Sequence, residues 1–298
     1  MKILVTGSTG LVGNALVPAL ESKGHEVIRL VRGQAKNESE ANWNPEQGSI
    51  DAGRLNGIEA AVHLAGESIA DGRWSEEKKQ RIRDSRVKGT RLLSESLAQL
   101  NPQPRVLVSA SAIGFYGNRG AEILSEDSSS GNDFLSEVCR EWEAATAPAS
   151  QSGIRVVNVR IGIVLSSKGG ALAKMLTPFK FGAGGKIGSG EQYMSWVALD
   201  DVVGIIQHAI ENESLSGAVN TVAPNPVTNL EFTKTLGSTL SRPTIFPVPA
   251  FAARLAFGEM ADALLLSSAR VEPQRLKQSG YKFQFSMLIE ALQQVLKN

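Results

Sequence analysis

The feature that most constrains this chain is a glycine-rich turn close to its beginning. An apolar run at 3–5 is followed at once, at the start of a helical stretch, by Thr6-Gly7-Ser8-Thr9-Gly10-Leu11-Val12-Gly13. In such a turn one glycine permits the sharp bend, the next lets the backbone approach a pyrophosphate, and the third packs the helix against the strand. Free N–H groups and the helix dipole attract the phosphates. We therefore predict a dinucleotide site, with a purely structural turn as the alternative, formed by Gly7, Thr9, Gly10, Leu11, Val12 and Gly13.

Short β-branched runs alternate with longer amphipathic stretches over the first 165 residues. Runs of strand length lie at 3–5, 27–31, 61–64, 106–109 and 156–159, and 41–43 is a further short candidate. Helical stretches lie between them at 12–23, 76–99 and 134–151. Because the runs are continuously apolar, both faces of their sheet are expected to be buried. The pattern predicts an α/β fold in which helices cover a parallel sheet.

The end of the second strand indicates which dinucleotide is bound. NAD-binding proteins place Asp or Glu there to bind the ribose 2′-hydroxyl, whereas an arginine accommodates the 2′-phosphate of NADP. Here the strand runs into Arg32, with Lys36 close behind and no acidic residue before Glu38. This favours NADP, while a solvent-exposed arginine without a ligand is the alternative reading of Arg32.

Charge and composition exclude several other classes. Thirty-one Lys and Arg against thirty Asp and Glu give a net charge of +1, which supplies no overall field for nucleic acid or an anionic membrane. The single Cys139 and three scattered histidines match no disulfide scaffold or metal spacing. No secretory signal core or membrane span is apparent. We expect a cytoplasmic protein that binds no metal, nucleic acid or membrane.

The alternation of strand-like and helix-like segments becomes less regular after Val164, where glycine and proline residues separate shorter elements. We expect an NADP-binding domain over 1–165, with a returning segment near 191–212, and a substrate-side region over 166–298. In the returning segment, Trp196-Val197 reads as a strand that enters a helix. Asp200 and Asp201 are expected to cap that helix by accepting hydrogen bonds from its free N–H groups.

These motifs together resemble the short-chain dehydrogenase/reductase superfamily in its extended, epimerase-like branch. General matches are the glycine spacing, His63-Leu64-Ala65-Gly66, Ser109-Ala110-Ser111 and Phe115-Tyr116-Gly117. Matches to an atypical subgroup of epimerase-family proteins of unknown substrate are Arg73-Trp74, Ser85-Arg86-Val87-Lys88-Gly89-Thr90, Asp133-Phe134-Leu135, Val138-Cys139-Arg140-Glu141-Trp142-Glu143 and Gly188-Ser189-Gly190. The resemblance covers essentially the whole chain, including a C-terminal segment from about residue 246.

The resemblance implies a doubly wound Rossmann sheet that binds NADP at the carboxyl ends of its strands. It places Leu64 and Ala65, with Gly66 and Ser109 beside them, along the cofactor, and Val164 near the nicotinamide. Arg86 stands where extended relatives usually carry asparagine, so it is expected to face the cofactor or the substrate pocket. An exposed arginine on the helix surface is its alternative reading.

The resemblance also shows what is missing for catalysis. Members of the superfamily use a tyrosine to transfer the proton, a lysine four residues later to lower its pKa, and a serine to orient the carbonyl. The matching helix carries Phe134 and Val138 instead, and Ser111 remains. Tyr116 or Tyr193 could replace the acid, and Glu67 and Ser68 are further candidates. We take Ser111 and Tyr116 as the predicted catalytic residues.

The sequence supports two functional hypotheses. The first is an NADP-binding oxidoreductase or epimerase-like protein with atypical catalytic machinery. It acts on a small metabolite, for which a sugar-related compound is one candidate class. The second is a non-catalytic NADP-binding redox sensor or scaffold that signals to a protein partner. Both are compatible with a monomer or a homodimer, and neither identifies the substrate.

Overall fold

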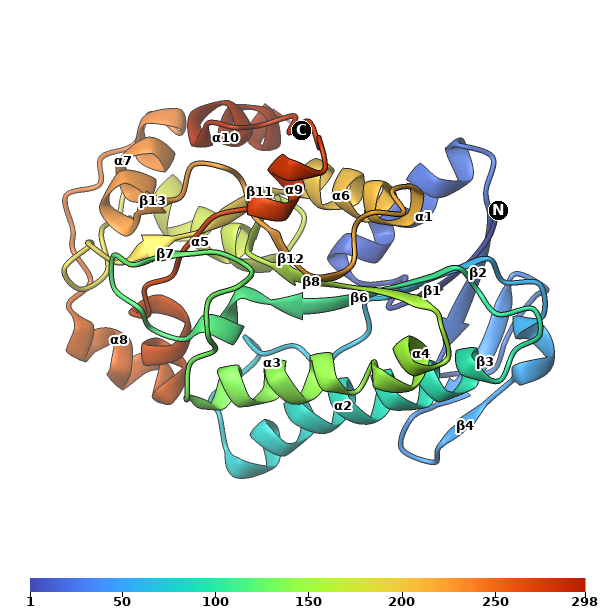
Figure 1. Ribbon diagram of the computed structural model, residues 1–298. Coiled ribbons are helices and arrows are strands. Elements are labelled where there is room, and N and C mark those ends of the chain that lie inside the picture. Colours follow the sequence, from blue (N-terminus) through green and yellow to red (C-terminus); the bar gives the residue numbers. More distant parts are fainter. Residues whose placement is uncertain (298) are drawn as a thin grey trace.

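The fold is built on one large parallel sheet, seen in a computed structural model that describes residues 1–297 (Figure 1). The eight strands follow the order β12-β8-β6-β5-β1-β2-β3-β4, and all neighbours are parallel except the antiparallel pair β3 and β4. Their bounds are β1 Lys2–Thr6, β2 Glu26–Val31, β3 Glu40–Asn44, β4 Ser49–Ile50, β5 Ala60–His63, β6 Val106–Ala112, β8 Arg155–Ile161 and β12 Gly217–Thr221. This order is that of a doubly wound dinucleotide-binding sheet, so the predicted fold class is confirmed.

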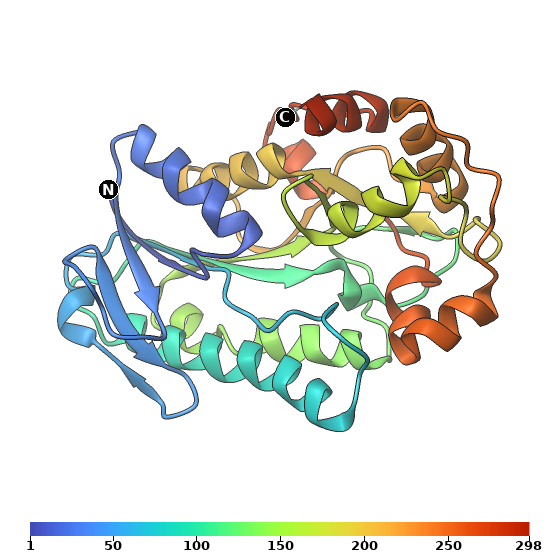
Figure 2. The ribbon, with the colours of Figure 1, turned by 180° about the vertical axis from the view of Figure 1, so that it is seen from behind.

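Helices cover both faces of the sheet, as Figures 1 and 2 show. On one face lie α1 (Leu11–Ser22) and α6 (Leu199–Glu211), and on the other lie α2 (Glu76–Ala98), α3 (Phe134–Ala144) and α4 (Ala147–Gln151). Successive side chains of a strand point to opposite faces. Ile3 and Val5 accordingly belong to the core under α1 and α6, whereas Leu4 belongs to the core on the other face. The continuous apolar run at 3–5 is thus explained by burial on both sides.

The predicted strands all appear within a few residues of their expected bounds, and one predicted helix is divided. The stretch 134–151 forms α3 and α4, separated at Ala145 and Thr146. Pro148 lies in the first turn of α4, where its missing N–H costs nothing. Within a single continuous helix the same proline would remove an interior hydrogen bond, which explains the break.

The remaining chain forms a smaller layer at the carboxyl ends of the strands (Figure 2). Three two-stranded sheets pair β7 (Ile123–Leu124) with β14 (Arg270–Val271), β9 (Ile163–Leu165) with β11 (Trp196–Ala198), and β10 (Tyr193–Met194) with β13 (Val227–Thr228). The helices of this layer are α5 (Gly170–Lys180), α7 (Asn229–Thr239), α8 (Ala250–Phe257), α9 (Gln274–Gln278) and α10 (Leu288–Lys297), with single turns η2 (Ile113–Tyr116) and η3 (Ala261–Leu265). A further single turn, η1 (Ala52–Leu55), leads from β4 to the amino end of β5.

The chain returns from this layer to the main sheet. α6 packs beside α1, and β12 then pairs in parallel with β8 at the edge of the sheet. The main sheet therefore draws on residues well beyond 165, and the division into domains stays a prediction. Among residues 1–297, no helix is both long and apolar enough to cross a membrane.

The expected capping of α6 by Asp200 and Asp201 is wrong. No side chain caps the start of this helix, and Asp201 is fully buried. Its carboxylate accepts hydrogen bonds from the backbone N–H groups of Gln284 (2.8 Å) and Phe285 (3.1 Å) and from the hydroxyl of Tyr281 (3.1 Å). Asp201 therefore holds the C-terminal segment against α6, because its buried carboxylate needs hydrogen-bond donors and this segment supplies them.

Candidate functional site

The glycine turn between β1 and α1 has no room for side chains. Gly7 has a φ of +65°, and a Cβ at this position would lie 2.7 Å from the carbonyl carbon of Leu64. A Cβ on Gly13 would meet the Gly7 carbonyl oxygen and would lie 2.7 Å from the Cα of Ser8. The Gly10 N–H closes the turn by donating to the Gly7 oxygen at 3.0 Å. The glycines thus bring the end of β1, the start of α1 and the loop after β5 into direct contact.

The N-terminus of α1 is open to a ligand. Gly10 occupies the N-cap position, so no side chain accepts a hydrogen bond from the first turn, and that turn contains no acidic residue. Thr9 and Gly10 are exposed, and Leu11 and Val12 are half-buried. A helix start that is neither capped nor neutralised carries free N–H groups and positive potential, which is the arrangement that binds phosphate.

Thr6 and His63 fix the loop that faces this turn. The Thr6 Oγ1 accepts hydrogen bonds from the N–H groups of Leu64 (3.1 Å) and Ala65 (3.2 Å) and lies 2.7 Å from Nδ1 of His63. Burial lowers the pKa of His63 to about 4, so the ring is neutral. Thr6 and His63 therefore share one buried hydrogen bond, whose direction depends on the tautomer of the neutral ring. The sequence reasoning missed this pair, although Thr6 and His63 end neighbouring strands.

A basic group formed by Arg32, Lys78 and Arg81 lies beside the same loop. The Lys78 Nζ lies 2.8 Å from a carboxylate oxygen of Glu67, and the Arg81 Nε lies 3.7 Å from it. The pKa of Glu67 is lowered, first by the hydrogen bond from Lys78 and less strongly by the charges of Arg81 and Arg32. Arg32 itself is exposed at the end of β2. Lys78 and Arg81 were not expected here; their spacing of three on α2 puts them on one helix face.

Arg86 points from α2 toward Gly66 and α3. A Cβ on Gly66 would lie 3.3 Å from the Arg86 Cζ, which is also 5.0 Å from the centre of the Trp142 ring. One nitrogen donates to the carbonyl of Ile82 at 3.0 Å. Burial lowers the pKa of Arg86, and no carboxylate of residues 1–297 pairs with it. Arg86 thus lies under the loop after β5 and not on the exposed face of α2.

Val164 lies close to the start of α1, whereas Ser109 lies deeper. A Cβ on Gly170 would be 3.3 Å from a methyl carbon of Leu11 and 3.8 Å from the carbonyl oxygen of Val164. The loop that follows β9 therefore packs against the glycine turn. Ser109 pairs in register with His63 inside the sheet and is fully buried, so its hydroxyl does not reach the open side of the site.

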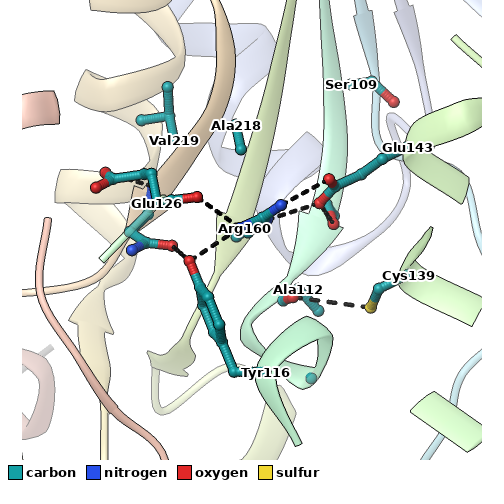
Figure 3. Close-up of polar contacts among 12 residues, drawn as sticks. Ser109, Ala112, Tyr116, Glu126, Cys139, Glu143, Arg160, Ala218 and Val219 are labelled. Carbon is teal, nitrogen blue, oxygen red and sulfur yellow. Dashed lines mark hydrogen bonds and ion pairs between the residues drawn. The ribbon is translucent and has the colours of Figure 1, made fainter. Parts of the chain in front are cut away.

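Ser111 and Tyr116 belong to a buried network around Arg160. Figure 3 labels Tyr116, Glu143 and Arg160 of this network. Arg160 pairs with both carboxylate oxygens of Glu143, at 2.8 and 2.9 Å, and Ser111 donates to the same carboxylate at 2.7 Å. The Tyr116 hydroxyl accepts from Arg160 at 3.0 Å and donates to Asn220 at 2.6 Å. Burial raises the pKa of Tyr116. We call these five residues the Arg160 network; both predicted catalytic hydroxyls are held within it, and their catalytic role stays a prediction.

The helix face that would carry the tyrosine and lysine is apolar. Phe134 packs edge-to-face on Trp74, with ring centres 5.4 Å apart, and Val138 is buried. The neighbouring Cys139 is buried as well, and burial raises the pKa of its thiol to about 12. Tyr193, the other candidate acid, is half-buried on β10. This face of α3 offers no group that transfers a proton near neutral pH.

Two family models cover most of the chain. Residues 3–222 match the NAD dependent epimerase/dehydratase family, and residues 248–295 match DUF1731, a domain of unknown function. An epimerase family protein of Mycobacterium bovis is 45% identical over 290 residues, which are 97% of this chain and 96% of that protein.

Solved structures with high sequence identity share the fold. The crystal structure of human epimerase family protein SDR39U1 (isoform 2) with NADPH has a TM-score of 0.93 and 35% identity, and covers 100% of both chains. A nucleoside-diphosphate sugar epimerase from Corynebacterium glutamicum has a TM-score of 0.82 and 41% identity, over 98% of this chain and 57% of that one.

Proposed function

The chain belongs to the NAD dependent epimerase/dehydratase family, in an atypical short-chain dehydrogenase/reductase branch with a C-terminal DUF1731 domain, and on this premise we propose that it binds NADPH. The predicted family resemblance is confirmed. The human relative with the same fold is crystallised with NADPH. The cofactor supplies a hydride, and this chain supplies the surface that holds and orients it.

The open start of α1 is the observation that carries the cofactor proposal. Gly7 and Gly13 let the turn pack against the loop after β5 and the start of α1, and with Gly10 at the N-cap the first N–H groups of α1 are left free for a pyrophosphate. Leu64 and Ala65 would then line the adenosine side, and Val164 the nicotinamide side, because the loops that carry them contact this turn. The residues present fit a dinucleotide.

The basic group supports NADPH over NADH. Arg32 would contact the 2′-phosphate, with Lys78 and Arg81 adding positive potential across the mouth of the site. Because Glu67 is already paired with Lys78, it neutralises part of this potential, and Arg32 is left as the cation without a partner among residues 1–297. The discrimination between the two dinucleotides therefore rests mainly on Arg32.

We propose an oxidoreductase or epimerase that acts on a small metabolite with reduced catalytic machinery. Phe134 and Val138 take the places of the tyrosine and lysine, as the resemblance of α3 to the family pattern implies. Ser111 and Tyr116 are the hydroxyls that the family pattern leaves as candidates for the proton transfer. A proton that either hydroxyl gave up would have to be replaced through the Arg160 network, since both hydroxyls are already hydrogen-bonded there.

The same geometry favours a second candidate function. In a redox sensor or scaffold, bound NADPH is held without turnover and its presence is passed to a protein partner. An apolar α3 face and two fully engaged hydroxyls support this reading, because neither transfers a proton readily at neutral pH. A panel of carbonyl compounds and nucleotide sugars separates the two functions. Oxidation of NADPH by any member of the panel supports catalysis, and no oxidation of NADPH by any member supports the sensor.

Thermal unfolding tests the cofactor proposal. NADPH should raise the melting temperature of the wild-type protein more than NADH does, because a ligand that binds only the folded state stabilises it by mass action. Arg32→Glu should weaken NADPH binding about tenfold or more while leaving NADH binding nearly unchanged. Arg105→Glu, a charge reversal at an exposed site before β6, is the matched control. Equal responses to both dinucleotides would refute the role of Arg32.

A further inference from the structure

The loop between β5 and α2 runs from the glycine turn toward the C-terminal layer. Its first residue, Leu64, contacts Gly7 of the turn, and its residues 66–75, which we call the strap, are all half-buried or exposed. The strap runs below α5 in Figure 2. Because no side chain of residues 66–75 is fully buried, the strap is not anchored in an apolar core. Segments of this kind open locally at a low free-energy cost.

Lys174 of α5 holds the middle of the strap. Its Nζ donates to the carbonyl of Ala70 at 2.8 Å and lies 3.1 Å from a carboxylate oxygen of Asp71. The hydrogen bond from Lys174 is the main cause of the lowered pKa of Asp71. The two side chains are 58% and 67% exposed, so water competes for this ion pair and the pair contributes little to stability. We call these contacts the latch, and we expect the latch to open without unfolding the rest of the chain.

The strap is also held near both of its ends, by contacts other than the latch. Near its start, the Glu67 carboxylate pairs with the nearly buried Lys78 at 2.8 Å. Near its end, Arg73 donates to the carbonyl groups of two residues in the last turn of α8. Between these anchors Gly72 has a φ of +76°, and a Cβ at this position would meet no atom within 4 Å. The backbone around Gly72 can therefore change its conformation without a clash.

The strap, the glycine turn and α5 form a closed ring of contacts. On one side, Gly7 contacts Leu64 at the root of the strap. On the other side, Leu11 contacts Gly170, the first residue of α5, where a Cβ would lie 3.3 Å from a methyl carbon of Leu11. Lys174 lies about one helical turn after Gly170, and the latch joins it to the strap. The start of α1 thus forms one side of the ring, and the latch closes the opposite side.

We propose that the strap is a lid on the cofactor site, and that the latch opens to admit NADPH and closes over its pyrophosphate. This inference rests on the proposed function, which puts the adenosine side at Ala65 and the nicotinamide side at Val164. The carbonyl oxygen of Val164 would lie 3.8 Å from a Cβ on Gly170, so Val164 is next to the ring. A dinucleotide that contacts both Ala65 and Val164 therefore passes the start of α1 beneath the strap. Its two end groups are bulkier than the pyrophosphate between them, so uptake and release require the latch to open.

The rate of NADPH release tests the latch. Protein with bound NADPH is mixed with excess NADP⁺ in a stopped-flow instrument, and the loss of bound NADPH fluorescence gives the dissociation rate. Lys174→Met and Asp71→Asn should each speed release about two- to fivefold, the effect expected from an exposed ion pair. Lys23→Met breaks the exposed pair with Glu211 at the other end of α1 and should leave the rate unchanged. Unchanged release in both latch variants overturns the proposal.

The same two variants distinguish the latch from a direct contact between Lys174 and the cofactor. If Lys174 binds the pyrophosphate and not the strap, Lys174→Met speeds release, whereas Asp71→Asn frees the lysine and slows release. Changes of opposite sign therefore overturn the latch, and changes of the same sign support it.

A covalent crosslink tests the lid with a larger effect. The double variant Asp71→Cys with Lys174→Cys is joined by a short bis-maleimide, while Cys139 does not react, because its thiol is buried and its pKa is raised to about 12. With the latch locked, uptake of NADPH and release of NADPH bound beforehand should both slow about tenfold or more. The same variant treated with a monofunctional maleimide is the matched control. Equal rates in the crosslinked and the control protein overturn the lid.

Equilibrium titration separates this inference from the cofactor proposal. If the wild type binds no NADPH, both are wrong. If it binds NADPH and the crosslink leaves the rates unchanged, the lid is wrong and the cofactor site stands.

Discussion

The glycine turn and the Arg160 network lie at the carboxyl ends of strands of the same sheet, and they treat polar groups in opposite ways. At the turn, the start of α1 has no cap, and Arg32 and Arg86 have no carboxylate partner among residues 1–297. In the network, Arg160, Glu143 and Tyr116 are joined by hydrogen bonds of 2.8–3.0 Å. The unpaired donors at the turn indicate a place for a ligand. In the network, the protein's own side chains already supply the hydrogen-bond partners.

The stability of the protein should depend on the ion pair of the Arg160 network, and breaking this pair should have the largest effect of the changes described below. Arg160 and Glu143 are only 5% and 14% exposed, so Glu143→Ala leaves a buried cation unpaired. The free energy of unfolding should fall by about 3–5 kcal/mol, measured by urea denaturation. The double variant Arg160→Met with Glu143→Leu should recover most of the loss, since it buries no unpaired charge. A loss below about 1 kcal/mol in the single variant would contradict the contrast between the two regions.

His63, below the loop after β5, should make the free energy of unfolding depend on pH. This is the second-largest effect that we expect. Burial lowers its pKa from 6.5 to about 4 in the folded protein. Between these values the unfolded chain binds a proton that the folded protein does not, so stability falls as the pH falls. The contribution should reach about 3 kcal/mol at pH 4.

Denaturation at several pH values from 7 to 4 measures this slope. His63→Gln has no ionisable ring and should reduce the slope over this range, while a variant at the half-exposed His208 should change it much less, since its pKa is lowered less by burial. An equal slope in wild type and His63→Gln would mean that other groups dominate the acid sensitivity.

Substitution of Arg86 should change NADPH binding more than stability, whereas substitution of Glu143 should change mainly stability. The effect of the Arg86 substitution on stability should be the smallest of the three. Arg86→Met keeps the length of the side chain and removes a buried charge that has no carboxylate partner. The free energy of unfolding should change by less than about 1 kcal/mol, while NADPH affinity should fall about tenfold. Denaturation and calorimetry measure the two quantities. A large loss of stability with unchanged NADPH affinity would assign Arg86 to packing between α2 and α3.

Much of the fold could be predicted because its causes are local. The apolar runs at 3–5 and 106–109 give strands buried on both faces, and the glycines at 7, 10 and 13 give the turn. The break between α3 and α4 was missed, although Pro148 disfavours a continuous helix, because the apolar spacing of Val138, Trp142 and Ala149 continues across it. The inward role of Asp201 was missed because its partners, Gln284 and Phe285, lie more than eighty residues away.

The sequence by itself determined the α/β sheet, the glycine turn and the arginine after the second strand, since each depends on neighbouring residues and backbone geometry. Only the tertiary structure decided which polar groups have partners. Ser111 and Tyr116 read as free hydroxyls in the sequence and are held by Glu143, Asn220 and Arg160 in the fold. Pairing depends on where distant strands end, and that position is fixed by packing the whole chain.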